Sequence, residues 1–170
     1  MTPIHLEMIR AKILSIAEPT PSTEQWLELR KLAIAERLPI CCSDGNPRGA
    51  QLQISYWIGS ALPIHRLIRR PTKQQAYEFR AMEALLDTLQ GQPAIIWVDS
   101  TNIADFLNNR FHFKRNGTPA CVWRVLRKFR ASQAQVIWRD QKTVNRYLAL
   151  SKRSKPLKDL LTCQPTVSSM

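Results

Sequence analysis

Apolar residues recur with helical spacing in two short segments at the start of the chain. Residues 3–17 carry large apolar residues at close to helical spacing, and the segment ends at a run that contains two prolines. A second apolar stripe follows over residues 22–37, where Ser22 or Thr23 can cap the first turn. A hairpin of this size is too small to be a domain alone. We therefore expect residues 1–37 to be a helical extension, available for a protein partner or for self-association.

The pattern changes to that of β-strands from residue 38. A short apolar run over residues 40–42 predicts a strand, and the turn-forming residues 43–49 predict a loop after it. Residues 51–58 alternate between apolar and polar, and residues 62–68 return after a Gly-Ser turn, with Ile64 and either Leu67 or Ile68 expected to be buried. These segments predict three consecutive antiparallel strands.

Helices and strands alternate over the rest of the chain. Thr72 and Gln75 form a capping-box pattern, which predicts a helix that runs to about Gln90. Residues 94–98 are continuously apolar, as is typical of a strand buried on both faces. The same rules predict helices over residues 100–108, 119–129 and 143–151 and a strand over residues 135–138. The order of elements indicates an α/β domain over residues 38–151, followed by a basic, flexible tail over residues 152–170.

Charge is distributed unevenly along the 170 residues. The net charge is +12, but residues 110–158 hold 14 basic residues and one acid, and the remainder is close to neutral. Such a surplus favours a polyanionic partner, although a basic run can also be a solubilising face. Phe111, Phe113 and Trp123 interleave with the basic residues and could stack on bases, while core packing is an equal alternative for Trp123. The candidate nucleic-acid-binding residues are Asn46, Arg110, Lys114, Arg115, Arg124, Arg127, Lys128, Arg139, Lys142 and Arg146.

Other classes of protein fit the sequence poorly. No apolar run approaches the ~20 residues needed to span a bilayer, and the N-terminus lacks the pattern of a secretory signal. The four cysteines have neither metal-site nor disulfide-framework spacing. We therefore expect a soluble, cytoplasmic protein with no membrane association.

Three acids occupy positions at which this order of elements can bring them together. Asp44 ends the first predicted strand and Asp99 ends the fourth, so both would emerge at one sheet edge if these strands are parallel neighbours. Glu78 continues the apolar stripe of its helix, whereas Glu83 is expected on the solvated face. Taken singly, Asp44 is typical of a turn and Asp99 of a helix N-cap. Taken together with Glu78, they suggest an all-oxygen site for Mg²⁺ or Mn²⁺, because clustered carboxylates repel one another without a cation.

At this point the chain resembles the ribonuclease H-like family. The strand and loop from Ile40 through Asp44-Gly45, the Glu78-bearing segment 75–86, and the strand that ends in Asp99-Ser100 occur in the family's order, over roughly residues 38–151. The resemblance implies a five-stranded mixed sheet with the antiparallel strands at one side. It also implies metal-dependent cleavage of phosphodiester bonds, typically of RNA in an RNA–DNA hybrid, with Asp44, Glu78 and Asp99 as catalytic metal ligands and two metal ions.

The C-terminal part of the family pattern is incomplete in this chain. The family usually has a loop His and then a fourth Asp, but residues 138–149 contain no His, and Ala149 stands where that Asp would be. Asp140 is the candidate fourth catalytic acid, and Asn145 is an alternative to it. Three functions remain open: a nuclease, a weakened domain that only binds RNA or DNA or acts as an adaptor, and a branched-DNA resolvase or transposition-related nuclease.

Overall fold

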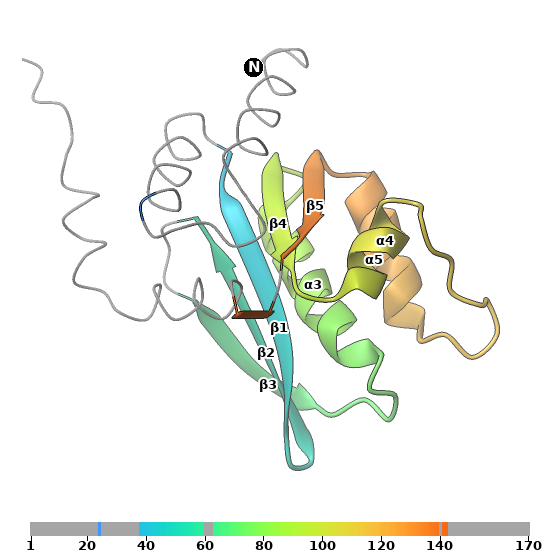
Figure 1. Ribbon diagram of the computed structural model, residues 1–170. Helices are drawn as coiled ribbons and strands as arrows, with labels where there is room; N and C mark the ends of the chain where they lie inside the picture. Colours follow the sequence, from blue (N-terminus) through green and yellow to red (C-terminus); the bar gives the residue numbers. More distant parts are fainter. Residues whose placement is uncertain (1–23, 25–37, 60–62, 140, 143–170) are drawn as a thin grey trace, which may run out of the picture.

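The computed structural model describes residues 24, 38–59, 63–139 and 141–142 and shows a five-stranded mixed sheet with helices on one face (Figure 1). The strands lie in the order β3-β2-β1-β4-β5. The strands are β1 (Ile40–Arg48), β2 (Gln51–Ile58), β3 (Ile64–Arg69), β4 (Ala94–Val98) and β5 (Ala134–Trp138). The helices are α3 (Ala76–Leu89), α4 (Thr101–Leu107) and α5 (Ala120–Arg130). The expected helical extension, the helix over residues 143–151 and the basic tail lie outside the described residues, apart from residue 24.

The pairing of the strands confirms the expected topology. Strands β1, β2 and β3 are consecutive antiparallel neighbours, and β1–β4 and β4–β5 are parallel pairs. Cys42 lies opposite Trp97 in the parallel pair, and Asp44 lies opposite Ser55 in the antiparallel pair. The part of β1 just before Asp44 and the end of β4 just before Asp99 therefore lie side by side.

The core fills the space between the sheet and the three helices. Strand β4 is buried along its whole length, as its continuous apolar run predicts, and helix α3 buries the stripe that includes Met82 and Leu85. The sheet contributes Cys41, Tyr56, Ile96, Val98 and Val136, and helices α4 and α5 contribute Phe106, Val122 and Val125. This apolar layer holds the beginnings of α3 and α4 against the sheet.

Two predictions about the strands were wrong. Strand β1 does not end before Asp44 but continues to Arg48, because it stays paired with β2 after its parallel pairing with β4 has ended. The turn follows at Gly49, whose φ of +60° suits glycine. Ile64 and Leu67 are exposed, at 39% and 58%, because β3 is an edge strand of the described sheet. Ile68, the predicted alternative to Leu67, is half-buried and packs against the core.

The ends of the helices differ from the prediction at one position. Helix α3 begins at Ala76 with Gln75 as its N-cap and no side-chain cap, so the capping box at Thr72 is wrong. Helix α4 begins as predicted, since the Ser100 hydroxyl accepts a hydrogen bond of 3.4 Å from the Ile103 N–H. Within the described residues, no helix has both the length and the apolar character required to cross a bilayer.

Candidate active site

Close contact between β1 and α3 positions the first two acids. A Cβ on Gly45 would lie 2.3 Å from the carbonyl oxygen of Tyr77, so only glycine fits where the first turn of α3 crosses the strand. Glu78 is in that turn, and its Oε1 accepts a hydrogen bond of 3.4 Å from the Gly45 N–H. The carboxylate of Glu78 is thereby held next to the backbone of the residue that follows Asp44.

Strand register brings the third acid close to the first. Asp44 and Asp99 each come two residues after a member of the parallel pair Cys42–Trp97. Asp44 lies within β1 and Asp99 directly follows β4, and the charges of both act on Glu78. Burial, then the Cys41 thiol, and then the charges of Asp44 and Asp99 raise the pKa of the Cys42 thiol.

The three carboxylates affect one another electrostatically. Burial, and then the charges of Asp44 and Asp99, raise the pKa of Glu78 to about 8, against the lowering effect of its hydrogen bond to Gly45. Burial also raises the pKa of Asp99. At neutral pH and without a cation, Glu78 therefore holds a proton in the folded protein.

The three acids have the chemistry that a hard divalent cation prefers, although their side chains are not grouped around one point. Asp44, Glu78 and Asp99 supply only carboxylate oxygens, and their mutual repulsion is what a cation would relieve. Among the described residues, however, no three His, Cys, Asp or Glu side chains are grouped closely enough to hold one metal ion. The candidate fourth acid, Asp140, and the alternative Asn145 lie outside the described residues.

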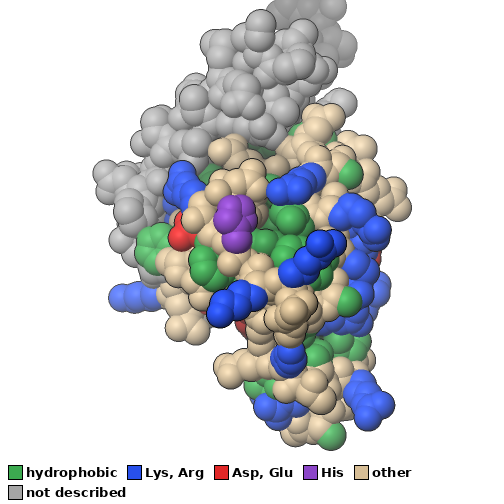
Figure 2. All heavy atoms as spheres, turned by 90° about the vertical axis from the view of Figure 1, so that its right-hand side faces the viewer, with side chains coloured by type: hydrophobic (Ala, Val, Ile, Leu, Met, Phe, Trp, Pro, Cys, Tyr) green, Lys and Arg blue, Asp and Glu red, His purple; other side chains and the backbone are tan. Residues whose placement is uncertain are grey.

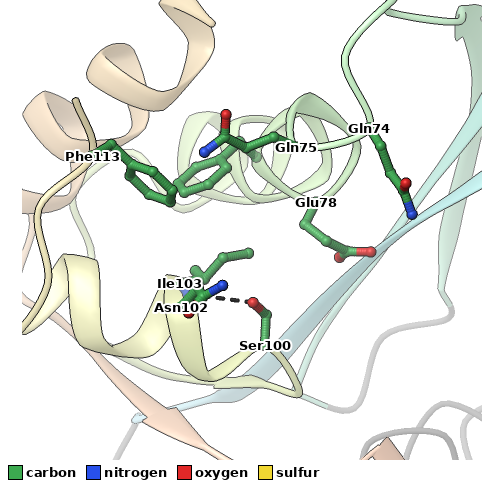
Figure 3. Close-up of a pocket in the computed structure, with 8 residues that line it drawn as sticks. Gln74, Gln75, Glu78, Ser100, Asn102, Ile103 and Phe113 are labelled. Atoms are coloured by element: carbon green, nitrogen blue, oxygen red, sulfur yellow. Dashed lines mark hydrogen bonds between the residues drawn. The ribbon is translucent and has the colours of Figure 1, made fainter. Parts of the chain in front are cut away.

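A pocket of about 400 Å³ adjoins Glu78 between the first turns of α3 and α4. Figure 3 shows Glu78 reaching from α3 toward Ser100 at the start of α4, with Phe113 farther along the pocket. Phe113 comes from the segment between α4 and α5. The pocket therefore joins one of the acids to the segment that carries much of the basic charge.

A contact across the strands beside Asp44 was not anticipated from the sequence. Ser55 Oγ and His65 Nδ1 lie 2.7 Å apart and share a hydrogen bond, and Ser55 is buried. Asp44, Ser55 and His65 are register partners on β1, β2 and β3, so they form one row across the sheet. This row could have been predicted only from the register of the β-hairpins, because its members are ten or more positions apart in the sequence.

Most of the predicted basic residues are exposed. Arg110, Lys114 and Arg115 precede α5, and Arg127 lies on the exposed side of that helix. Figure 2 shows this side of the molecule, where Lys and Arg side chains surround a smaller hydrophobic area and acidic side chains are scarce. Asn46 and Lys142 are also exposed, whereas Arg146 lies outside the described residues.

Arg124 and Lys128, two of the predicted nucleic-acid-binding residues, instead form ion pairs with an acid of α3. Arg124 Nε lies 2.6 Å and Lys128 Nζ 3.3 Å from Oε1 of Glu83, which is buried and not on a solvated face as predicted. Burial alone would raise the pKa of Glu83, but its hydrogen bonds and ion pairs with Arg124 and Lys128 lower it below the ordinary value. Arg139 is also buried, with its guanidinium 5.3 Å from the centre of the Trp97 ring.

Comparison with known proteins relates the fold to one class of enzymes. No protein-family model and no curated protein matches the chain. Among solved structures it is similar to LC11-RNase H1, isolated from compost by a metagenomic approach, with a TM-score of 0.55, 15% identity, and coverage of 74% of this chain and 99% of that one. LC11-RNase H1 in complex with an RNA/DNA hybrid gives a TM-score of 0.53 at 14% identity, with 63% and 89% of the two chains covered. The likeness, together with the strand order described above, shows that the chain has a ribonuclease H-like fold.

Proposed function

We propose that the protein is a divalent-metal-dependent nuclease that cleaves phosphodiester bonds, with the RNA strand of an RNA–DNA hybrid as its substrate. The observation that carries this proposal is the position of Glu78 on α3, where its Oε1 accepts a hydrogen bond from the Gly45 N–H and where burial, and then the charges of Asp44 on β1 and of Asp99 after β4, raise its pKa to about 8. Three carboxylates that repel one another on a ribonuclease H-like fold are the arrangement expected of a cation site. The hybrid substrate is extended to this chain from the LC11 complex.

Each group has a distinct role in this proposal. Asp44, Glu78 and Asp99 would bind Mg²⁺ or Mn²⁺, with Asp140 as the fourth catalytic acid. When bound, these ions would stabilise the attacking and leaving oxygens of the phosphodiester. Glu78 would give up its proton when the cation binds, because the positive charge favours the ionised carboxylate.

The exposed basic residues would hold the nucleic-acid backbone beside the acids. Arg110, Lys114, Arg115 and Arg127 are exposed and can contact phosphates directly. Arg124 and Lys128 are paired with Glu83, and Arg139 is buried, so we assign these three residues no phosphate contact. Asn46 and Lys142 are exposed and remain candidates for the same surface.

The test is cleavage of labelled substrates by the full-length protein with Mg²⁺, Mn²⁺ or EDTA. We expect the RNA strand of a hybrid to be cut with metal, and duplex or branched DNA to be cut far more slowly. The variant Asp44→Asn should abolish cleavage, whereas Asp105→Asn, which removes an acid of α4 outside the site, should not. Equal cleavage by the wild type and Asp44→Asn would show a contaminating nuclease and overturn the proposal.

A second candidate is a domain that binds nucleic acid without turnover. It is favoured by the lack of a three-ligand metal group among the described residues and by Ala149 at the position of the family's fourth acid. Tight binding in EDTA that is unaffected by Asp99→Asn and weakened by Arg127→Glu, with no cleavage of any substrate, would select it. A symmetric dimer that cuts four-way junctions would instead select a branched-DNA resolvase.

A further inference from the structure

The lining of the pocket beside Glu78 combines apolar and polar side chains. Its apolar part includes the aromatic ring of Phe113 and the aliphatic side chain of Ile103. Its polar part consists mainly of the carboxamides of Gln74, Gln75 and Asn102, and Figure 3 shows Asn102 next to Ile103. A planar, heteroaromatic ligand with polar edges matches this combination.

The aromatic ring of Phe113, which lines the pocket, is held in place by packing. The ring of Phe113 makes edge contacts with Phe79, at 5.7 Å between ring centroids, and with Phe106, at 4.8 Å. Phe79 and Phe106 are buried, while Phe113 is only half-buried and borders the pocket. Phe113 can therefore offer a stacking surface with little loss of side-chain freedom on binding.

The carboxamides that line the pocket have unused hydrogen-bonding capacity. Each carboxamide offers two N–H donors and a carbonyl acceptor, which is the combination that reads the edge of a nucleobase. Within the part of the chain that the structure describes, the side chains of Gln74, Gln75 and Asn102 make no hydrogen bond. A base that enters the pocket would not have to displace an existing protein contact.

The surroundings favour a base that is attached to a phosphate backbone. Lys114 and Arg115 directly follow Phe113 and are exposed, and Arg110 lies three residues before it. Glu78 lines the same pocket, so a base held there would lie close to the acids. About 400 Å³ is enough to hold one base.

We propose that the pocket between α3 and α4 binds a single unpaired nucleobase, turned out of the strand whose phosphate lies at Asp44, Glu78 and Asp99. This inference rests on the proposed function, since it takes these acids to face the nucleic-acid backbone. The base stacks on Phe113 and hydrogen-bonds to the carboxamides of Gln75 and Asn102. The protein would then prefer hybrids that contain a bulge or a mismatch over perfectly paired ones.

The test compares two hybrids of equal charge by fluorescence anisotropy in EDTA. One hybrid carries a single bulged adenosine in the RNA strand, and the other carries an abasic ribose at that position. We expect the adenosine bulge to bind the wild type about five- to a hundredfold more tightly, the range for stacking one base on an aromatic side chain. Equal affinities for the two hybrids would overturn the proposal.

Two variants test whether the pocket causes the difference in affinity between the two hybrids. Phe113→Leu should remove most of the difference between the two hybrids, and Asn102→Ala, at an exposed position on α4, should reduce it without disturbing the core. Asn116→Ala is the matched control, because Asn116 is exposed on the same segment but does not line the pocket. Discrimination unchanged in both Phe113→Leu and Asn102→Ala would overturn the assignment.

Binding in EDTA separates this inference from the nuclease activity. A protein that discriminates between the bulges but cuts nothing would retain the base pocket and contradict the nuclease. A protein that cuts hybrids but binds the adenosine-bulge and abasic hybrids equally would support the nuclease and contradict the base pocket.

Discussion

At the scale of single residues, Gly45 determines how closely α3 can approach the sheet. Any other side chain at this position would overlap the carbonyl of Tyr77, one residue before Glu78. The same approach allows the Gly45 N–H to donate to Glu78. The spacing between Asp44 and Glu78 therefore depends on the absence of a side chain between them.

The substitution Gly45→Ala should destabilise the protein by about 2–3 kcal/mol, because the backbone of α3 must move away from β1. The measurement is the free energy of unfolding in urea. Gly49→Ala is the matched control: Gly49 has a positive φ but no atom within 4 Å of the added Cβ, so the cost should be about 1 kcal/mol. Equal effects of the two substitutions would contradict the close approach.

Glu78 should make stability fall as pH rises in the absence of metal. Its pKa is about 8 in the folded protein and near the ordinary 4.5 when unfolded, so the folded state binds more protons between these values. The free energy of unfolding in EDTA should therefore decrease from pH 5 to pH 9 by a few kcal/mol, on the order expected for a shift of this size. Urea titrations at several pH values measure this change.

Two comparisons attribute this slope to the carboxyl group. Glu78→Gln should flatten the dependence on pH, because the amide does not titrate. Mn²⁺ should change it in the wild type, since the charge of a bound cation favours the ionised carboxylate and lowers its pKa. An unchanged slope in Glu78→Gln would mean that another group is responsible.

The sequence could predict the residues whose positions depend on local pattern. Asp99 directly follows a continuous apolar strand and Glu78 lies on an apolar stripe, so strand-end and helix-face reasoning located both. His65 and Glu83 were missed because their partners are far away in the sequence: Ser55 is ten positions from His65, and Arg124 is 41 positions from Glu83. A charge pattern on one helix cannot show that a second helix supplies its counterions.

At the scale of elements, an ion-pair cluster connects α3 to α5. Glu83 of α3 accepts hydrogen bonds from Arg124 and Lys128 of α5, and Lys128 also contacts Asp87. A buried carboxylate is stable only with such partners. Two of the residues that looked suited to phosphate contacts instead connect the two helices, and Arg127 and Arg130 are the exposed basic residues of α5.

Arg124→Ala should therefore affect mainly stability, and Arg127→Ala mainly binding. The first should lower the free energy of unfolding by about 1–3 kcal/mol, because Glu83 loses its shortest ion pair while remaining buried. The second should change stability by less than about 0.5 kcal/mol but weaken binding to a hybrid, since Arg127 is exposed. Urea unfolding and anisotropy measure the two effects, and equal losses of affinity would contradict the ion-pair assignment.

At the scale of the whole molecule, the basic segment and the acids occupy adjoining regions of one fold. The sheet order puts β4 next to β1 and β5 beyond β4, and the segment between α4 and α5 lies on the helix side of this half of the sheet. Arg110, Lys114 and Arg115 therefore lie on the α4–α5 side, whereas β3 forms the opposite sheet edge. A nucleic acid held by the basic segment would reach the acids and leave β3 uncovered.

Salt dependence should distinguish this surface from the other basic residues of the protein. Each phosphate contact contributes about 0.9 to the slope of log K against log salt concentration, so changing Arg110, Lys114 and Arg115 together to alanine should lower the slope by about 2–3. The matched control changes Arg66 and Arg69 to alanine, because both are exposed on β3 at the far edge of the sheet. Anisotropy titrations of a hybrid at several salt concentrations measure both slopes. If the β3 variant lost as much slope as the triple variant, the affinity would come from net charge alone, and the directed approach to the acids would be wrong.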